Sequence, residues 1–412
     1  MFYNRFARIL RGVSMKMSCY ADGRYKKHLM QKISKIYQRD DMAIDEIKNA
    51  AFIIDTNTGA FGIFDDKGKI VKSCLQYRGK NAQFIPKYIS DVDCMDCDAV
   101  FLGNVYPHFG HFLLEHLNRA WGISKIKSKN IKYVLVDNKN MGPKQWMIDF
   151  LKCAGVSEKD ILILNSSMRF RKVYVPSQSL NIVSGWYGAE FKDAFDAMRK
   201  NVKSDVVYDK VYVSRAKLSN DMRVWGEEKI QRIFEKNGFT VIYPETMPLY
   251  EQIAIISHCN VLAGCAGTAL HLALTMKEGT RVIQLNRTSA IKDNGEIQYR
   301  LCKLKNQDFD IVAASVEEVQ STHGGVHAPQ IIGVTKYLQQ FFDDNNFKYN
   351  DDDLIPDADA LEQYHTALAE FQKNNGGQLY LKFKKKFIKY ISCLIPGRVT
   401  RGRVRKWLKE KM

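Results

Sequence analysis

The segment from Val261 to His271 constrains the fold of this chain more than any other. A short apolar run, Val261 to Ala263, leads into Gly264 and Gly267, and a helix-like stretch follows from Thr268. This order predicts a β-strand, a tight glycine turn and a helix. Because glycine has no Cβ atom, the backbone of such a turn can approach a ligand closely. The free N–H groups of the first helical turn favour a phosphate there, although many α/β folds contain the same junction without a ligand.

Apolar strands and amphipathic helices alternate along two stretches of the chain. Residues 51–204 contain short apolar runs separated by helical patterns at 110–121 and 142–154, and residues 205–320 repeat the alternation. Alternation at this spacing predicts βαβ units with a largely parallel sheet. We therefore expect an α/β fold of two facing Rossmann-like domains, with ligands in the cleft at the carboxyl ends of the strands.

The remaining segments are assigned by composition. We expect a basic N-terminal extension over 1–50, a first Rossmann-like domain over 51–204 and a second Rossmann-like domain over 205–320. Helices that pack back on the core are expected over 321–377, and a basic amphipathic tail over 378–412.

Charge is concentrated at the C-terminal end. The net charge is +17, and residues 378–412 hold twelve Lys or Arg against one acid, Glu410. In this tail Tyr380, Phe383 and Phe387 recur at helical spacing, and lysines fall elsewhere on the helical wheel. That pattern is typical of a helix lying on an anionic membrane, although a docked core helix or a nucleic-acid arm is an alternative. The body lacks the basic and aromatic interleaving expected of a nucleic-acid-binding surface, so we expect no nucleic acid.

Cysteine usage and hydropathy predict a cytoplasmic protein. The nine cysteines are scattered and lie mostly in apolar segments, as reduced core cysteines would. No apolar run is long enough for a transmembrane helix, and the N-terminus has no signal-peptide core. Together with the tail, this favours peripheral association with the inner face of the cytoplasmic membrane.

Polar residues are dense after the strand that ends at Gly103. On a helix, His111 and Glu115 share one face, and His108 lies one turn earlier. A carboxylate beside an imidazole fixes the tautomer and raises its basicity, as a general base requires. The alternative is a helix start that these groups merely cap and solvate. The order does not match His-Glu-x-x-His, so a metal site is disfavoured.

Two further groups could bind a nucleotide. Arg215 and Lys217 leave the end of the strand at 211–214, where they could neutralise a diphosphate, or simply form a solvated basic turn. Glu251, early in the helix after Pro248, could accept hydrogen bonds from ribose hydroxyls. It could equally be an acid that opposes the helix dipole without a ligand.

Five ordered motifs resemble one enzyme family. They are Gly110 to Trp121 (GHFLLEHLNRAW), 211–217 (VYVSRAK), 238–245 (GFTVIYPE), 251–257 (EQIAIIS) and 261–270 (VLAGCAGTAL). The set resembles glycosyltransferase family 61, the capsular polysaccharide biosynthesis family. The resemblance implies a GT-B-like fold and inverting transfer of a sugar from a nucleotide-sugar donor, with no cofactor and no essential metal.

The resemblance also implies roles for individual residues. It places Arg215, Lys217 and the turn residues Gly264, Gly267 and Thr268 at the donor diphosphate, in a nucleotide-sugar-binding domain over 205–320, and makes 51–204 the acceptor-side domain. The position of Glu251 separately favours a contact with the ribose. The resemblance places the candidate bases His111, Glu115 and His108 on the acceptor side, with Tyr106 and Arg119. The chain departs from the family at Ala266, where a histidine is common, so that phosphate contact is missing or is replaced by the Thr268 hydroxyl.

These observations predict a bacterial glycosyltransferase that acts on a glycan or lipid-linked acceptor in capsular or lipopolysaccharide synthesis. One alternative is a metal-dependent GT-A-type transferase, because 91–93, 308–310 and 357–359 spell Asp-x-Asp. Another is a non-catalytic scaffold that binds membranes or nucleic acid through its basic tail.

Overall fold

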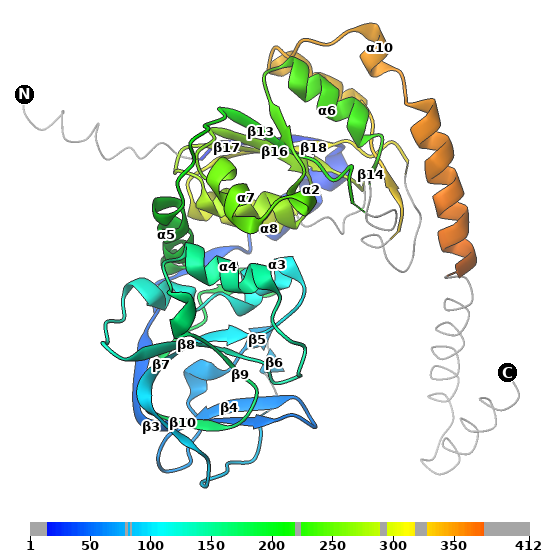
Figure 1. Cartoon of the computed structure of the whole chain (residues 1–412). Coiled ribbons are helices and arrows are strands. Elements are labelled where there is room, and N and C mark those ends of the chain that lie inside the picture. Colours follow the sequence, from blue (N-terminus) through cyan, green and yellow to red (C-terminus); the bar gives the residue numbers. More distant parts are fainter. Residues whose placement is uncertain are drawn as a thin grey trace, which may run out of the picture.

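The protein contains two six-stranded sheets, one above the other in Figure 1, with helices between and around them. The computed structural model describes residues 15–78, 81–82, 85–218, 224–288, 295–317 and 328–374. Parallel strands joined through helices confirm the α/β class.

The first sheet is only partly parallel. Its strand order is β4-β3-β10-β7-β8-β9. Strands β10, β7, β8 and β9 are mutually parallel, whereas β3 pairs antiparallel with both β10 and β4. The largely parallel sheet predicted here is therefore correct for four strands. The strands are β3 (Ile44–Asp55), β4 (Ala60–Phe64), β7 (Cys94–Asn104), β8 (Ile131–Val136), β9 (Ile161–Leu164) and β10 (Met168–Pro176).

The second sheet is parallel throughout, in the order β1-β18-β17-β16-β13-β15. Its central strands are apolar runs, such as Val261–Cys265, because a parallel sheet is covered on both faces. The strands are β1 (Met17–Tyr20), β13 (Lys210–Val213), β15 (Thr240–Ile242), β16 (Val261–Cys265), β17 (Arg281–Asn286) and β18 (Asp308–Ala313). Helices α6 (Glu227–Lys236), α7 (Leu249–Ile256) and α8 (Gly295–Leu304) belong to this unit.

The described part of the N-terminal stretch is not an extension. Strand β1 is an edge strand that pairs with β18, and helix α2 (Gly23–Ile33) contacts α8. Tyr25, Leu29 and Ile33 are buried, and Lys32 forms an ion pair with Glu296 at 2.9 Å. Within α2, basic residues such as Lys26 and Lys32 lie between the buried positions of an amphipathic helix, so 17–33 belongs to the unit that contains the second sheet.

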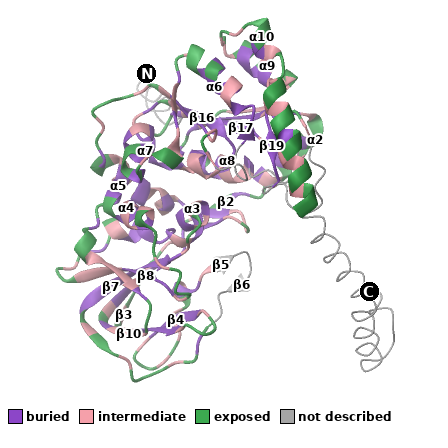
Figure 2. Ribbon diagram, turned by 45° about the vertical axis from the view of Figure 1, so that its right-hand side comes forward, coloured by how far each residue is buried: buried purple, intermediate pink, exposed green. Residues whose placement is uncertain are grey.

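One hydrophobic core joins the two sheets. It includes Val100 of β7 and Leu262 of β16, together with the helices between them. These helices are α4 (Gln145–Cys153) and α5 (Asp193–Asn201), and the buried purple layer in Figure 2 continues from one sheet through them to the other. Buried Arg300 of α8 also donates to the Asn181 carbonyl oxygen at 3.0 Å. The two units therefore meet through a packed interface.

Two predicted helices are irregular. The 110–121 pattern forms the single turn α3 (Phe109–His111), then a π-helix η2 (Phe112–His116), in which Leu117 N donates to Phe112 O at 2.8 Å, and then η3 (Ala120–Ser124). The pattern after the glycine turn forms a 3₁₀-helix, η7 (Thr268–Thr275). Neither has the α-helical hydrogen bonding that the apolar spacing predicted.

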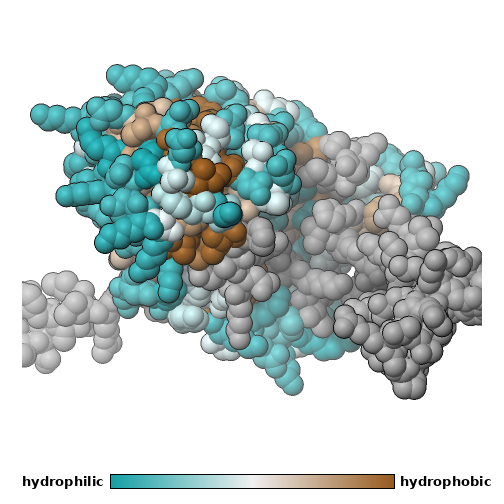
Figure 3. Space-filling model, turned by 90° about the horizontal axis from the view of Figure 1, so that it is seen from below, coloured by the Kyte–Doolittle hydropathy of each residue, from teal (hydrophilic) through white to brown (hydrophobic). Residues whose placement is uncertain are grey.

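Short strands and turns complete the described fold. They are η1 (Lys72–Cys74), β5 (Tyr77–Arg78), β6 (Asn81–Ala82), η4 (Glu158–Asp160), η5 (Ala189–Lys192) and η6 (Pro244–Thr246). A small sheet contains β11 (Leu180–Asn181), β12 (Trp186–Gly188) and β2 (Tyr37–Arg39), and β14 (Val224–Trp225) pairs with β19 (Gln330–Ile331). The end of the molecule seen from below is largely hydrophilic, with small apolar patches (Figure 3).

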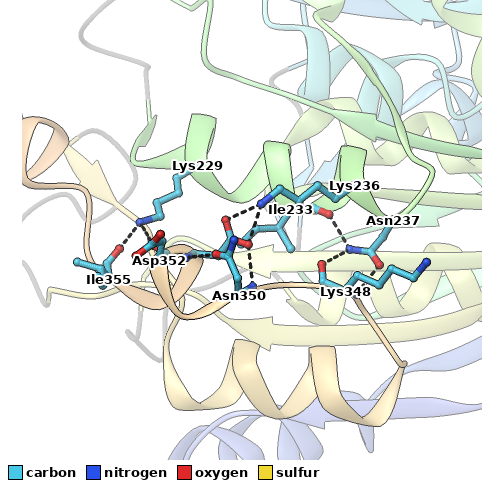
Figure 4. A network of polar contacts seen from close by, with 9 residues as sticks. Lys229, Ile233, Lys236, Asn237, Lys348, Asn350, Asp352 and Ile355 are labelled. Carbon is cyan, nitrogen blue, oxygen red and sulfur yellow. Dashed lines mark hydrogen bonds and ion pairs between the residues drawn. The ribbon is translucent and has the colours of Figure 1, made fainter.

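The C-terminal helices are bonded to α6 through polar contacts. Helix α9 (Lys336–Asp344) is followed by α10 (Asp351–Leu354) and by a helix over 358–374. As Figure 4 shows, Lys229 donates to the Asp352 carbonyl oxygen at 2.6 Å, and Lys236 forms an ion pair with Asp353 at 2.9 Å. The acidic stretch 343–353 thus holds these helices against α6.

The predicted membrane-association tail, 378–412, lies outside the described residues. Within the part of the chain that the structure describes, no helix is both long enough and apolar enough to cross a membrane.

Candidate functional site

The glycine turn follows β16 at the carboxyl end of the second sheet. A Cβ on Gly264 would lie 2.6 Å from the Val213 carbonyl oxygen, and one on Gly267 would lie 2.9 Å from Nη1 of Arg215. Gly264 therefore lets β13 and β16 approach each other, whereas Gly267 leaves room for the guanidinium. The backbone at Gly267 is extended, with a φ of 166°, which any residue can adopt. Glycine is therefore required here by the close approach of Arg215 and not by the backbone conformation.

Arg215 and Lys217 come from the turn that follows the neighbouring strand β13. The Arg215 guanidinium stands over Gly267, and its backbone N–H donates to Oε2 of Glu227 at 3.0 Å. Lys217 is exposed, with Nζ 4.0 Å from the centroid of the Tyr243 ring, just after β15. Three adjacent parallel strands thus bring two cations and a glycine turn to one edge of the sheet, as the sequence predicted.

The histidine-rich segment forms a compact cluster of rings after β7. His108 caps α3 and accepts a hydrogen bond from the His111 backbone N–H at 3.4 Å. The His111 ring lies 4.6 Å from that of His108 and 5.7 Å from that of Tyr106, centroid to centroid. Nδ1 of His111 hydrogen-bonds Oε2 of Glu115, which is 8 % exposed. With an ionised Glu115, Nδ1 is the donor, which leaves Nε2 of His111 free to accept a proton.

The ring cluster and the glycine turn are in contact. A Cβ on Gly110 would lie 2.2 Å from Cγ2 of Thr268, so α3 and the start of η7 pack without an intervening side chain. The structure therefore brings His108, His111 and Glu115 beside the turn that holds Gly267 and Thr268. This contact joins the unit of the first sheet to that of the second.

Arg119 lies beneath the ring cluster. Its side chain has no exposed surface, and it donates to the Ser73 and Leu75 carbonyl oxygens and to Oε1 of Gln76, at 2.8–3.0 Å. Burial lowers the pKa of Arg119 to about 10. Gln76 in turn donates to the Glu115 carbonyl oxygen at 2.7 Å. Arg119 thus supports the backbone of the cluster from inside the first unit, and its full burial does not fit the prediction that it contacts a sugar acceptor.

Glu251 is exposed in the first turn of α7, which packs against η7. The neighbouring Gln252 is nearly buried and donates to the carbonyl oxygens of Pro244 and Met247 at 2.7 and 2.9 Å. Within the described residues, the structure joins Glu251 to neither cluster through a hydrogen bond or an ion pair.

Two of the three Asp-x-Asp sequences, 308–310 and 357–359, have other partners. Asp310 in β18 forms an ion pair with Arg281 at 2.6 Å, and Asp308 accepts a hydrogen bond from Lys16 N at 2.8 Å. Asp357 accepts one from Ala360 N at 3.0 Å. No group of three or more His, Cys, Asp or Glu side chains in the described segments is arranged to hold a metal ion.

Two residues beside the turn were not predicted from the sequence. Glu227 begins α6, is fully buried, and has a pKa raised by burial to about 7. His271 in η7 pairs through Nδ1 with Oε1 of Gln298 at 2.9 Å, and burial lowers its pKa. Glu227 resembles an ordinary first-turn helix acid in the sequence, and only the Gly226 before it hints at a special environment.

Comparison with known proteins identifies the family. Residues 109–283 match the family model described as Glycosyltransferase 61. This part of the chain belongs to glycosyltransferase family 61. The match runs from α3 into β17, so it includes His111, Glu115, Arg215, Lys217 and the glycine turn. The family makes the protein a glycosyltransferase, which confirms the resemblance of the five motifs. No curated protein matches the chain.

Proposed function

We propose that this glycosyltransferase binds a nucleotide-sugar donor at the glycine turn and transfers the sugar with inversion to a hydroxyl group of an acceptor. The observation that carries the proposal is the contact between Gly110 and Thr268. It sets an imidazole–carboxylate pair, His111 and Glu115, beside a turn with a guanidinium, so a base and a site for a leaving diphosphate are adjacent.

The donor diphosphate would lie over Gly267. Arg215 can form bidentate hydrogen bonds to phosphate oxygens, and Lys217 adds a positive charge that can move from the Tyr243 ring. The Thr268 hydroxyl and the free N–H groups at the start of η7 add donors. Ala266 stands where the family often has a histidine, so no imidazole is available there to bind phosphate. The Arg215 guanidinium would therefore make the main phosphate contact.

Inverting transfer is a single in-line displacement. Nε2 of His111 would take the proton of the acceptor hydroxyl while that oxygen attacks the anomeric carbon. The bond from the anomeric carbon to the diphosphate oxygen breaks, and its electron pair stays with the diphosphate. Glu115 would stabilise the imidazolium that forms, and Arg215 with Lys217 would stabilise the leaving group. His108 is the alternative base because its ring lies next to His111.

The two units would act as the halves of a GT-B-like enzyme, the first on the acceptor side and the second at the donor, without an essential metal. We further propose that the acceptor is a glycan or a lipid-linked glycan of capsular or lipopolysaccharide synthesis. Residues 378–412, with their twelve basic side chains, would hold the enzyme at the inner face of the cytoplasmic membrane.

Thermal unfolding in the presence of UDP, GDP, CDP and CMP, with and without EDTA, tests the proposal. A ligand that binds only the folded protein raises its unfolding temperature. We expect one nucleoside diphosphate to do so equally in EDTA, and Arg215→Ala to remove the effect. A response that EDTA abolishes would favour the metal-dependent alternative. No response to any nucleotide, together with binding to anionic vesicles, would favour the scaffold.

A further inference from the structure

A buried carboxyl group underlies the turn that presents Arg215. Glu227 has no exposed surface and accepts one hydrogen bond on each oxygen, from the Tyr212 hydroxyl at 3.1 Å and from the Arg215 backbone N–H at 3.0 Å. The Cys265 thiol, at the end of β16, also faces this carboxyl group. Glu227 therefore connects the carboxyl ends of β13 and β16 with the start of α6.

Glu227 is held in place from both ends of its helix. Before it, Gly226 has a φ of 76°, and a Cβ there would lie 2.3 Å from the Ile332 carbonyl oxygen. At the far end of α6, Lys236 pairs with Asp353 in the network of Figure 4. A first-turn glutamate normally projects into solvent and opposes the helix dipole at little cost. Burial of the Glu227 carboxyl group lowers the stability of the fold. We infer that a function in the site offsets this cost.

We propose that Glu227 is a positioning residue of the donor site, which sets the Arg215 guanidinium over Gly267 and takes up a proton when a diphosphate binds there. The proposal rests on the proposed function, because the turn must bind a diphosphate. The carboxyl group lies behind Arg215 and does not touch the ligand, so it acts through Arg215.

The coupling follows from charge. A bound diphosphate places negative charge on the far side of Arg215, and like charges nearby disfavour an ionised carboxylate. The pKa of Glu227 is already raised to about 7 by burial, so a further increase on binding changes its protonation near neutral pH. Since the protonated form binds the diphosphate better, affinity should fall as the pH rises through about 7.

Other charged groups near the carboxyl group set the size of this effect. Tyr212, Cys265 and Arg215 face it from the strand ends, and burial keeps the first two neutral by raising the pKa of each. Glu228 and Lys229 follow it on α6 at the partly exposed side, and Arg287 after β17 acts on Cys265. Arg215 is therefore the cation that both the carboxyl group and the diphosphate share.

Calorimetric titration of the full-length protein with UDP, GDP and CDP tests the proposal. Titrations in buffers of different ionisation enthalpy give the number of protons taken up on binding. For the tightest of these nucleotides, the wild type should take up a fraction of a proton near pH 7, and Glu227→Gln should take up less. The ratio of wild-type to variant Kd should rise about tenfold from pH 6 to pH 8. Titration of the nucleotide itself cancels in this ratio.

Asp310→Asn is the matched control, because Asp310 is a buried acid of the same sheet that pairs with Arg281, not with Arg215. It should retain the proton uptake of the wild type. In turnover assays Glu227→Ala should raise the donor KM about tenfold with a smaller change in kcat, since Arg215 is displaced and not removed. Circular dichroism shows whether each variant is folded. If Glu227→Ala does not fold, the test depends on Glu227→Gln, which preserves the shape of the side chain.

Equal proton uptake and equal Kd in wild type and Glu227→Gln would overturn the role of Glu227 while leaving the donor site intact. If the wild type binds none of the three nucleotides, the donor site itself is overturned, and the role of Glu227 with it. If Asp310→Asn also loses the proton uptake, the effect belongs to buried acids in general, and the specific role of Glu227 is overturned.

Discussion

The methyl group of Thr268 occupies the space that a side chain on Gly110 would need. Cγ2 of Thr268 lies 2.2 Å from the position of a Gly110 Cβ, and the Thr268 Cβ lies 3.2 Å from it. Gly110 belongs to the first unit and Thr268 to the second, so this pair sets how closely the ring cluster approaches the glycine turn. The relationship makes the active-site geometry testable by a pair of small substitutions.

Gly110→Ala should lower both stability and activity. The added methyl group must push α3 away from η7, and overpacking of this kind costs about 1–3 kcal/mol. Thr268→Ser removes Cγ2, so the double variant should recover part of the loss. Chemical denaturation and turnover assays on a double-mutant cycle measure the coupling, which we expect to exceed about 0.5 kcal/mol.

Gly23→Ala is the control, because a Cβ there would meet nothing within 4 Å. Additive effects of Gly110→Ala and Thr268→Ser would contradict the contact.

Arg215→Ala should remove donor binding without unfolding the protein. The side chain is only partly buried, whereas the backbone N–H that bonds Glu227 is kept in the variant. Loss of a cation that stabilises a leaving group lowers kcat/KM by roughly 10²–10³-fold. Lys217→Ala should have a smaller effect, because Lys217 is exposed and rests on Tyr243. Unchanged turnover in Arg215→Ala, measured as nucleoside diphosphate release, would remove Arg215 from the site.

His111→Ala should lower kcat and leave donor affinity nearly unchanged. A general base contributes about 10²–10⁴-fold to the rate, and His111 lies on the opposite side of the Gly110–Thr268 contact from Arg215. Glu115→Gln keeps the shape and should lower kcat less. His365→Ala, which alters a histidine paired with Glu317 on the surface, is the control. If His108→Ala reduces kcat more than His111→Ala does, then His108 is the base.

The sequence predicted the strand ends better than the helices that follow them. The strand predicted over 211–214 ends at Val213, and the run predicted to end at Gly264 ends at Cys265, because buried parallel strands are apolar runs that stop at polar or glycine residues. The α-helix predicted from Gly110 is instead a single turn followed by a π-helix. Apolar spacing does not separate helix types, since those types differ in hydrogen bonds that depend on packing.

Long-range contacts account for what the sequence could not predict. Arg119 lies in the matched motif like a ligand-binding residue, but carbonyl oxygens more than forty residues away fix it in the interior. Strand β1 joins β18 across nearly 300 residues, and no local pattern indicates that pairing. Glu227 is buried because Tyr212, Arg215 and Cys265 converge on it, and that convergence exists only in the folded sheet.

Glu227 should make the protein less stable as the pH rises. Its pKa is raised from 4.5 to about 7, so the folded state binds its proton more tightly than the unfolded state. The resulting stabilisation is complete below about pH 4.5 and is lost as the pH rises to about 7. A shift of this size corresponds to roughly 2–4 kcal/mol. The free energy of unfolding, measured from pH 5 to pH 8, should therefore fall less steeply with pH for Glu227→Gln than for the wild type. The same pH dependence in both proteins would show that Glu227 is ionised normally in the folded protein.

The basic tail should decide membrane association. Four lysines of the tail recur at helical spacing: Lys382, Lys385, Lys386 and Lys389. Each basic residue near an anionic leaflet contributes about 1 kcal/mol to the free energy of membrane binding. Replacement of these four lysines by glutamate in the full-length chain should abolish co-sedimentation with phosphatidylserine or phosphatidylglycerol vesicles. Nucleotide-induced thermal stabilisation should be unchanged, because the donor site lies in the second sheet. Replacement of the exposed Lys67, Lys69, Lys127 and Lys129 by glutamate tests whether any loss of positive charge has the same effect. Co-sedimentation that survives the tail substitutions, or a protein truncated after Gly377 that still binds the vesicles, would place the membrane-binding surface elsewhere.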